Sequence, residues 1–155
     1  ARALEESARV NAVYRALRDP LTRVDYLVRL EEGRTTREGA AVKPKAPPAL
    51  LAEMFEIQET LEEAKAGALN DAARASLGAQ REALHARMSR TEADITGPLS
   101  RAWDAAPPAG KGAALSALKE ALATRAYLRT VIEDLDAVLE TSSDDAVSRG
   151  APHPG

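Results

Sequence analysis

Two groups of side chains in this sequence have the types and the spacing that metal or acid–base chemistry uses. The first is Glu82 with His85, a Glu-x-x-His pair on a predicted helix, which is the arrangement found in di-iron helical bundles. Such a centre needs a second pair of this kind and two further inward-facing glutamates. The remaining histidine, His153, lies in a stretch near the end of the chain that we expect to be disordered. We therefore predict no metal site and no cofactor.

The second group is a row of carboxylates formed by Glu56, Glu59 and Glu63. Their spacing places them on one convex helix face, where they form no closed cage of oxygen ligands for a cation. The sequence has no cysteine, which excludes disulfides, thiolate metal ligands and a cysteine nucleophile. It also has no glycine-rich phosphate loop and no serine beside a suitable base. We predict that the chain is not an enzyme.

The composition favours helices as the elements that position these side chains. Hydrophobic residues make up 45% of the 155 residues but aromatic residues only 3%. A core of Ala, Leu, Val and Ile suits helix–helix packing better than a sheet. The net charge of −3 and the lack of a long basic run indicate that nucleic acid is not a partner. Neither a long apolar run nor a signal peptide is visible, so we expect a soluble, cytoplasmic protein that binds no membrane.

Apolar residues at three- and four-residue steps predict an all-α fold. The predicted helices cover residues 3–18, 20–30 and 48–65, a long stretch from Asn70 that kinks or breaks at Gly97-Pro98, and 112–140. Asp19 and Asn70 are predicted N-caps, because their side chains accept hydrogen bonds from the first free backbone N–H groups of a helix.

The same pattern divides the chain into four segments. We predict a helical hairpin in residues 1–32, a linker in 33–47, a three-helix antiparallel bundle in 48–140 and a disordered tail in 141–155. The chain does not begin with Met, and Ala1 already lies in a helix-like pattern. We therefore take it to be a piece of a longer protein.

The helix predicted for residues 48–65 has two faces of different character. Its apolar seam has the 4-3-4-3 spacing that packs against other helices, and consists of Leu50, Met54, Ile57, Leu61 and Ala64. The opposite face consists of Leu51, Ala52, Phe55, Glu56, Glu59 and Glu63. Phe55, the single phenylalanine of the chain, points about 140° away from the seam.

This face is either a docking strip for a protein partner or the edge of a wide apolar stripe in which Phe55 covers the bundle. An aromatic anchor flanked by three carboxylates has the makeup of an interface hot spot with a polar rim, and would favour a basic partner. In a homodimeric bundle paired through Phe55, glutamates would face their own copies and repel. Tyr127 points about 120° away from the leucine stripe of its helix, so it either shares this outer surface or lies along the bundle flank.

Two stretches of the sequence resemble the HscB family of co-chaperones. Residues 11–27 resemble the closing segment of a J-domain, with the family register kept at Asn11, Tyr14, Leu17, Asp19, Pro20, Arg23 and Tyr26. The ending from Tyr26 to Leu30 is similar to the Tyr-Leu-Leu-x-Leu of HscB proteins. Residues 48–63 are similar to the first helix of the HscB C-terminal bundle, and the helix around Tyr127 resembles the final helix more loosely.

The resemblance implies a J-protein that binds the iron–sulfur scaffold protein IscU and presents it to the DnaK-type chaperone HscA. It implies scaffold contacts at Leu51, Ala52, Phe55, Glu56, Glu59, Glu63 and Tyr127. Ala52 departs from the bulkier residue that the family has at this position. No His-Pro-Asp, the loop through which J-domains stimulate their chaperone, occurs in the sequence. We therefore expect this fragment to bind the scaffold without stimulating ATP hydrolysis.

Overall fold

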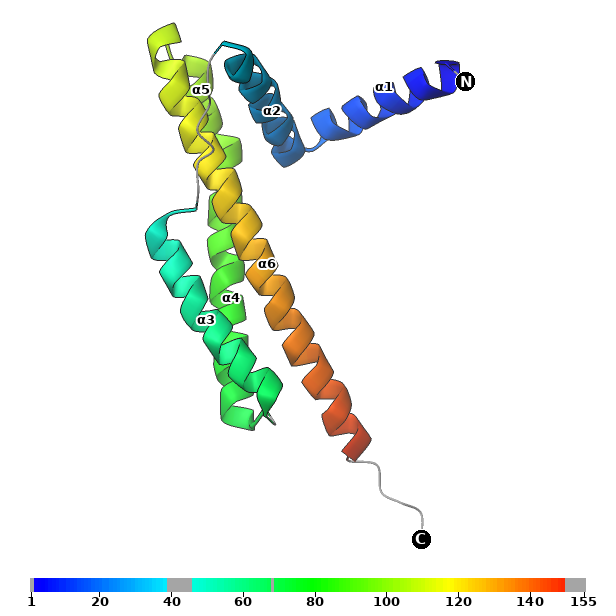
Figure 1. The fold of residues 1–155 in the computed structure, drawn as a ribbon, viewed down its shortest axis with the longest axis vertical. Coiled ribbons are helices and arrows are strands. Elements are labelled where there is room, and N and C mark those ends of the chain that lie inside the picture. Colours follow the sequence, from blue (N-terminus) through cyan, green and yellow to red (C-terminus); the bar gives the residue numbers. More distant parts are fainter. Residues whose placement is uncertain (1, 39–45, 68, 150–155) are drawn as a thin grey trace. The chain divides into compact units, whose positions relative to one another are not determined.

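The computed structural model describes residues 2–38, 46–67 and 69–149, and confirms the all-α prediction, since it holds no strand within these ranges (Figure 1). The α-helices are α1 (Arg2–Arg18), α2 (Pro20–Glu38), α3 (Pro48–Ala66), α4 (Asp71–Asp94), α5 (Ser100–Ala105) and α6 (Lys111–Arg149). They form two compact units, each described by itself below. Unit 1 comprises Ala1–Lys45 and Arg90–Ala123, and unit 2 comprises Ala46–Ser89 and Thr124–Gly155. The domain boundaries inferred from the sequence stay a prediction.

Unit 2 is the three-helix bundle that positions the candidate site. Its core is built almost wholly from aliphatic side chains, as the composition requires: Leu50, Met54, Ile57, Leu61, Leu77, Leu84, Leu128, Val131, Ile132, Leu135, Val138 and Leu139. The predicted seam of α3 is confirmed, because its first four members are buried and Ala64 packs against the same core. Burial of one apolar stripe per helix drives the three helices together.

Successive helices of unit 2 run in opposite directions. Within this unit α3 and α6 follow the same direction, and α4 runs against both (Figure 1). Gln58 Nε2 of α3 donates a hydrogen bond to Asp134 Oδ2 of α6 at 3.1 Å. Arg81 Nη1 of α4 donates to Asp136 Oδ1 at 3.2 Å. Asn70 caps α4 as predicted, because its Oδ1 accepts a hydrogen bond from the Ala73 N–H at 2.7 Å.

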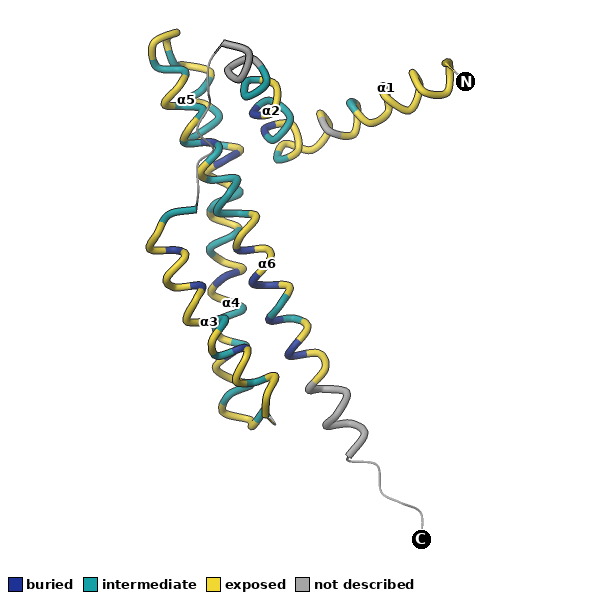
Figure 2. Tube along the Cα trace, viewed as in Figure 1, coloured by how far each residue is buried: buried dark blue, intermediate teal, exposed yellow. Residues whose placement is uncertain are grey.

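Unit 1 contains the two helices predicted for residues 3–18 and 20–30, which are α1 and α2. Asp19 caps α2, because its Oδ1 accepts hydrogen bonds from the N–H groups of Leu21 and Thr22 at 2.8 and 3.2 Å. The core of this unit joins α2 to later parts of the chain and consists of Val24, Val28, Ile95 and Leu118. Most described residues of α1 are exposed (Figure 2).

The Gly97-Pro98 step widens the helix where the sequence predicts a kink or break. Residues Ile95–Leu99 form a π-helix, η1, between α4 and α5. A proline in a helix lacks the N–H for the usual hydrogen bond and its ring clashes with the carbonyl four residues earlier. The wider turn relieves this clash, and the Ser100 hydroxyl donates a hydrogen bond to the Ile95 carbonyl at 2.5 Å.

Two helices extend beyond their predicted ends. Helix α2 continues to Glu38, so the predicted linker from Gly33 begins as helix. Helix α6 continues to Arg149, where the sequence analysis predicts a disordered tail from Thr141. Extending an existing helix adds one hydrogen bond per residue, so a glycine or a polar run need not end it. The remainders of the predicted linker and tail, with His153, lie outside the described residues.

Candidate docking surface

Helix α3 is held in a fixed rotation by its surroundings in unit 2. Its seam is buried in the core. On the α4 side of the seam, Glu53 Oε2 pairs with Arg87 Nη1 at 2.6 Å. On the α6 side, Gln58 donates to Asp134. With a buried stripe between these two contacts, the opposite face of α3 must point to solvent.

The structure confirms the predicted orientation of this opposite face. All six of its predicted members are exposed, namely Leu51, Ala52, Phe55, Glu56, Glu59 and Glu63. The Phe55 side chain is 62% exposed, so it does not cover the edge of the bundle within unit 2. A large ring left in water stabilises nothing in the free chain, whereas its burial by a partner is favourable.

Tyr127 lies on the edge of α6 that faces this surface. Leu51 precedes Gln58 by seven residues, and Tyr127 precedes Asp134 by the same number. Seven residues make nearly two helical turns, about 20° short. The Gln58–Asp134 hydrogen bond aligns these two residues, and α3 and α6 run in the same direction. Leu51 and Tyr127 therefore lie at the same level on facing helix edges. Tyr127 is 37% exposed, which fits both the outer surface and the bundle flank that the sequence leaves open for it.

The exposed apolar side chains of unit 2 coincide with the predicted site. Among its described residues, the exposed large hydrophobic side chains are Leu51, Phe55 and Tyr127. We call these three, together with Ala52, Glu56, Glu59 and Glu63, the docking surface. Whether a partner binds there stays a prediction.

The three carboxylates of the docking surface are available to a partner. Within the described part of the chain, no basic side chain pairs with Glu56, Glu59 or Glu63. By contrast, Glu53 pairs with Arg87 and Glu62 with Lys65. An unpaired row of exposed negative charge attracts a basic surface and speeds the encounter with it.

Glu62 and Gln58 were not predicted from the sequence to belong to the site or to position it. Gln58 falls between the seam and the outer face, and only the coordinates reveal its partner Asp134. Glu62 follows Phe55 by seven residues, so it lies on the same line along the helix. That spacing was the signal that could have found it.

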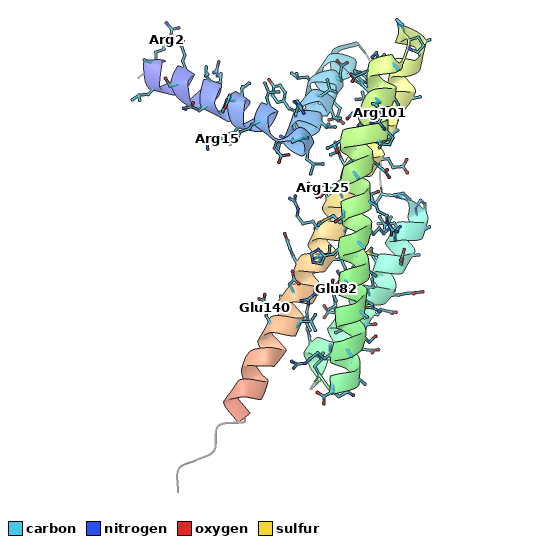
Figure 3. The ribbon with its side chains drawn as sticks, turned by 180° about the vertical axis from the view of Figure 1, so that it is seen from behind. Arg2, Arg15, Glu82, Arg101, Arg125 and Glu140 are labelled. Atoms are coloured by element: carbon cyan, nitrogen blue, oxygen red, sulfur yellow. The ribbon has the colours of Figure 1, made fainter. Side chains whose placement is uncertain are left out.

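That the chain holds no metal site stays a prediction. In the part of the chain that it describes, no group of three or more His, Cys, Asp or Glu side chains could hold an ion. Glu82 lies on α4 (Figure 3), with Oε1 3.9 Å from Arg81 Nη2, and His85 is exposed. Within the same ranges, no helix combines the length and the apolar character that crossing a bilayer requires.

A pocket of about 560 Å³ lies in unit 1. Its walls are mainly apolar and include Leu17, Val24, Leu27, Leu30 and Trp103. None of its lining residues belongs to the docking surface.

Comparison with known proteins finds sequence similarity to a curated co-chaperone. The chain is 38% identical over 88 residues to a protein described as "Co-chaperone protein HscB homolog" from Burkholderia multivorans (strain ATCC 17616 / 249). The matched region covers 57% of this chain and 49% of the relative, so the chain spans about half the length of that protein. No family model and no solved structure matches the chain. The similarity supports the predicted HscB-type relationship.

Proposed function

We propose that this chain is the scaffold-binding part of a cytoplasmic HscB-type co-chaperone of iron–sulfur cluster assembly. It acts as an adaptor and not as an enzyme: the docking surface binds an IscU-type scaffold protein, which is presented to a DnaK-type chaperone of the HscA kind. The observation that carries the proposal is the coincidence of exposed apolar side chains and unpaired carboxylates on one surface of unit 2. The HscB-type relationship supports it.

The chemistry of the surface suits protein binding. Phe55 supplies the large apolar anchor, and Leu51 and Tyr127 supply apolar area beside it. Anchors of this kind, buried at the centre of an interface and ringed by polar groups, account for most of the binding free energy in protein complexes. The glutamates of the rim favour a partner with basic residues around an apolar pocket.

Replacement of the anchor tests the proposal. Because Phe55 is the most exposed large hydrophobic side chain of the docking surface, we expect Phe55→Ala to weaken binding of an IscU-type scaffold by about 2 kcal/mol or more, about thirtyfold. Calorimetric titration with the purified scaffold measures this. The circular dichroism melting curve should hardly change, since the seam of α3 is untouched.

Tyr14→Ala is the matched control. Tyr14 is an aromatic residue on α1 that is 65% exposed and lies outside the docking surface. Its replacement should leave the affinity for the scaffold unchanged. Equal affinities of Phe55→Ala and the unmodified chain would refute the proposed function.

A further inference from the structure

We infer that Glu62 is a further specificity-determining residue of the docking surface. Lys65 holds its carboxylate in the free chain and gives way to a cationic side chain of the partner. This inference rests on the proposed function and deepens it. It specifies the partner as a protein with an apolar pocket for Phe55 and a lysine or arginine set about 10 Å further along the α3 axis.

The position of Glu62 relative to Phe55 supports this role. Seven residues separate the two, so their directions from the helix axis differ by about 20° and their levels by about 10 Å. Glu59, Glu63 and Glu56 lie about 40°, 80° and 100° from the direction of Phe55. Glu62 therefore points more nearly in the direction of Phe55 than these three carboxylates do, and a partner that extends along α3 from Phe55 meets it.

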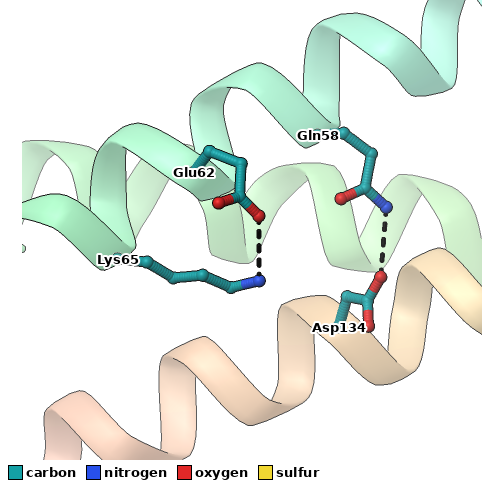
Figure 4. Close-up of polar contacts among 4 residues, drawn as sticks. All are labelled: Gln58, Glu62, Lys65 and Asp134. Atoms are coloured by element: carbon teal, nitrogen blue, oxygen red, sulfur yellow. Dashed lines mark hydrogen bonds and ion pairs between the residues drawn. The ribbon is translucent and has the colours of Figure 1, made fainter.

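The ion pair between Glu62 and Lys65 is weak enough for a partner's cation to replace Lys65. Lys65 Nζ lies 3.1 Å from Glu62 Oε1, and the side chains are 50% and 71% exposed. Figure 4 shows this pair beside the hydrogen bond from Gln58 to Asp134. Exposed ion pairs contribute little to stability because water solvates both charges well. A partner cation that excludes water from Glu62 makes a stronger bond than Lys65 does.

The pair also explains how the surface selects its partner. A protein that has an apolar pocket for Phe55 but no cation near Glu62 leaves the Glu62–Lys65 pair intact beside the interface. The pair then adds nothing to the binding free energy. A protein with the cation takes over Glu62 and releases Lys65 to solvent. The difference between the two complexes is a difference in affinity, which is what specificity requires.

Titration of the full chain with an IscU-type scaffold, at low and at high salt, tests the inference. We expect Glu62→Gln to weaken binding about tenfold at low salt, with a shallower salt dependence, because a charge-assisted hydrogen bond is lost. We expect Lys65→Gln to tighten binding about threefold, because the competing cation is gone. Lys65→Arg keeps the cation and should leave the affinity unchanged.

Glu133→Gln is the control for net charge, since Glu133 is exposed on α6 and points about 160° away from the core stripe of that helix. An unchanged affinity in Glu62→Gln, an equal loss in Glu133→Gln, or no tightening in Lys65→Gln overturns the inference. If Phe55→Ala still weakens binding about thirtyfold in that case, the proposed function stands without the inference on Glu62. If Phe55→Ala and Glu62→Gln both bind normally, the proposed function itself fails.

Discussion

Phe55 and Leu61 belong to the same helix and meet opposite surroundings. Leu61 is buried completely in the core of unit 2, whereas most of the Phe55 side chain is exposed to solvent. Burial of the Leu61 side chain therefore stabilises the folded state. Burial of the Phe55 side chain contributes free energy only when another molecule covers the ring. The smaller Leu51 illustrates an intermediate case, because it is partly covered within unit 2.

A pair of leucine replacements on α3 separates these two roles. We expect Leu61→Ala to lower the free energy of unfolding by about 2–5 kcal/mol, since it leaves a cavity in a packed core. Leu51→Ala should cost about 1 kcal/mol or less, because its side chain already contacts water. Urea denaturation followed by circular dichroism measures both. Similar losses in the two variants would mean that α3 is rotated differently in solution.

At the scale of elements, the docking surface depends on two helices that are far apart in the sequence. The Gln58–Asp134 hydrogen bond sets the register in which α3 lies beside α6. That register brings Tyr127 to the level of Leu51, because each precedes its member of the hydrogen-bonded pair by seven residues. A shift by one helical turn would separate the two side chains by about 5 Å without changing either helix.

A double-mutant cycle on Leu51 and Tyr127 checks this arrangement. Each single change to alanine should weaken scaffold binding, and the double change should cost less than the sum of the two. We expect a coupling free energy of about 0.5 kcal/mol or more, because neighbouring residues that share one partner surface are not additive. Strict additivity in the calorimetric affinities would indicate that the two helices contact the scaffold separately.

The faces of individual helices were predictable from the sequence, and the contacts between helices were not. The spacing of Leu50, Met54 and Ile57 on α3 fixes which side is buried, and therefore that Phe55 is exposed. The register against α6 could not be derived, because aliphatic seams of this kind fit one another in several registers and the Gln58–Asp134 hydrogen bond has no signature in the sequence.

The positions at which helices end could not be predicted from the sequence either. Proline at position 98 signals an interruption, but proline chemistry alone does not decide between a break and a π-turn. Likewise, the polar run after Thr141 lacks apolar periodicity, yet α6 runs through it to Arg149. Apolar periodicity reports which face of a helix is buried, and it does not fix the residue at which the helix ends.

At the scale of the whole molecule, the described residues form two hydrophobic cores. The core of unit 2 contains the seam of α3, and the core of unit 1 is built from Val24, Val28, Ile95 and Leu118. The two cores share no residue. All residues of the docking surface belong to unit 2. Damage to the core of unit 1 should therefore leave the docking surface in place.

Leu118→Ala tests this independence. Leu118 is fully buried, so its truncation should destabilise unit 1 by about 2–5 kcal/mol. We expect faster amide hydrogen exchange in α2 and α5, unchanged exchange in α3, and an affinity for the scaffold within about twofold of the unmodified chain, because local opening follows the packing of each core. Equally accelerated exchange in α3 would mean that the cores unfold as one cooperative structure, and scaffold binding would then fall together with the stability of unit 1.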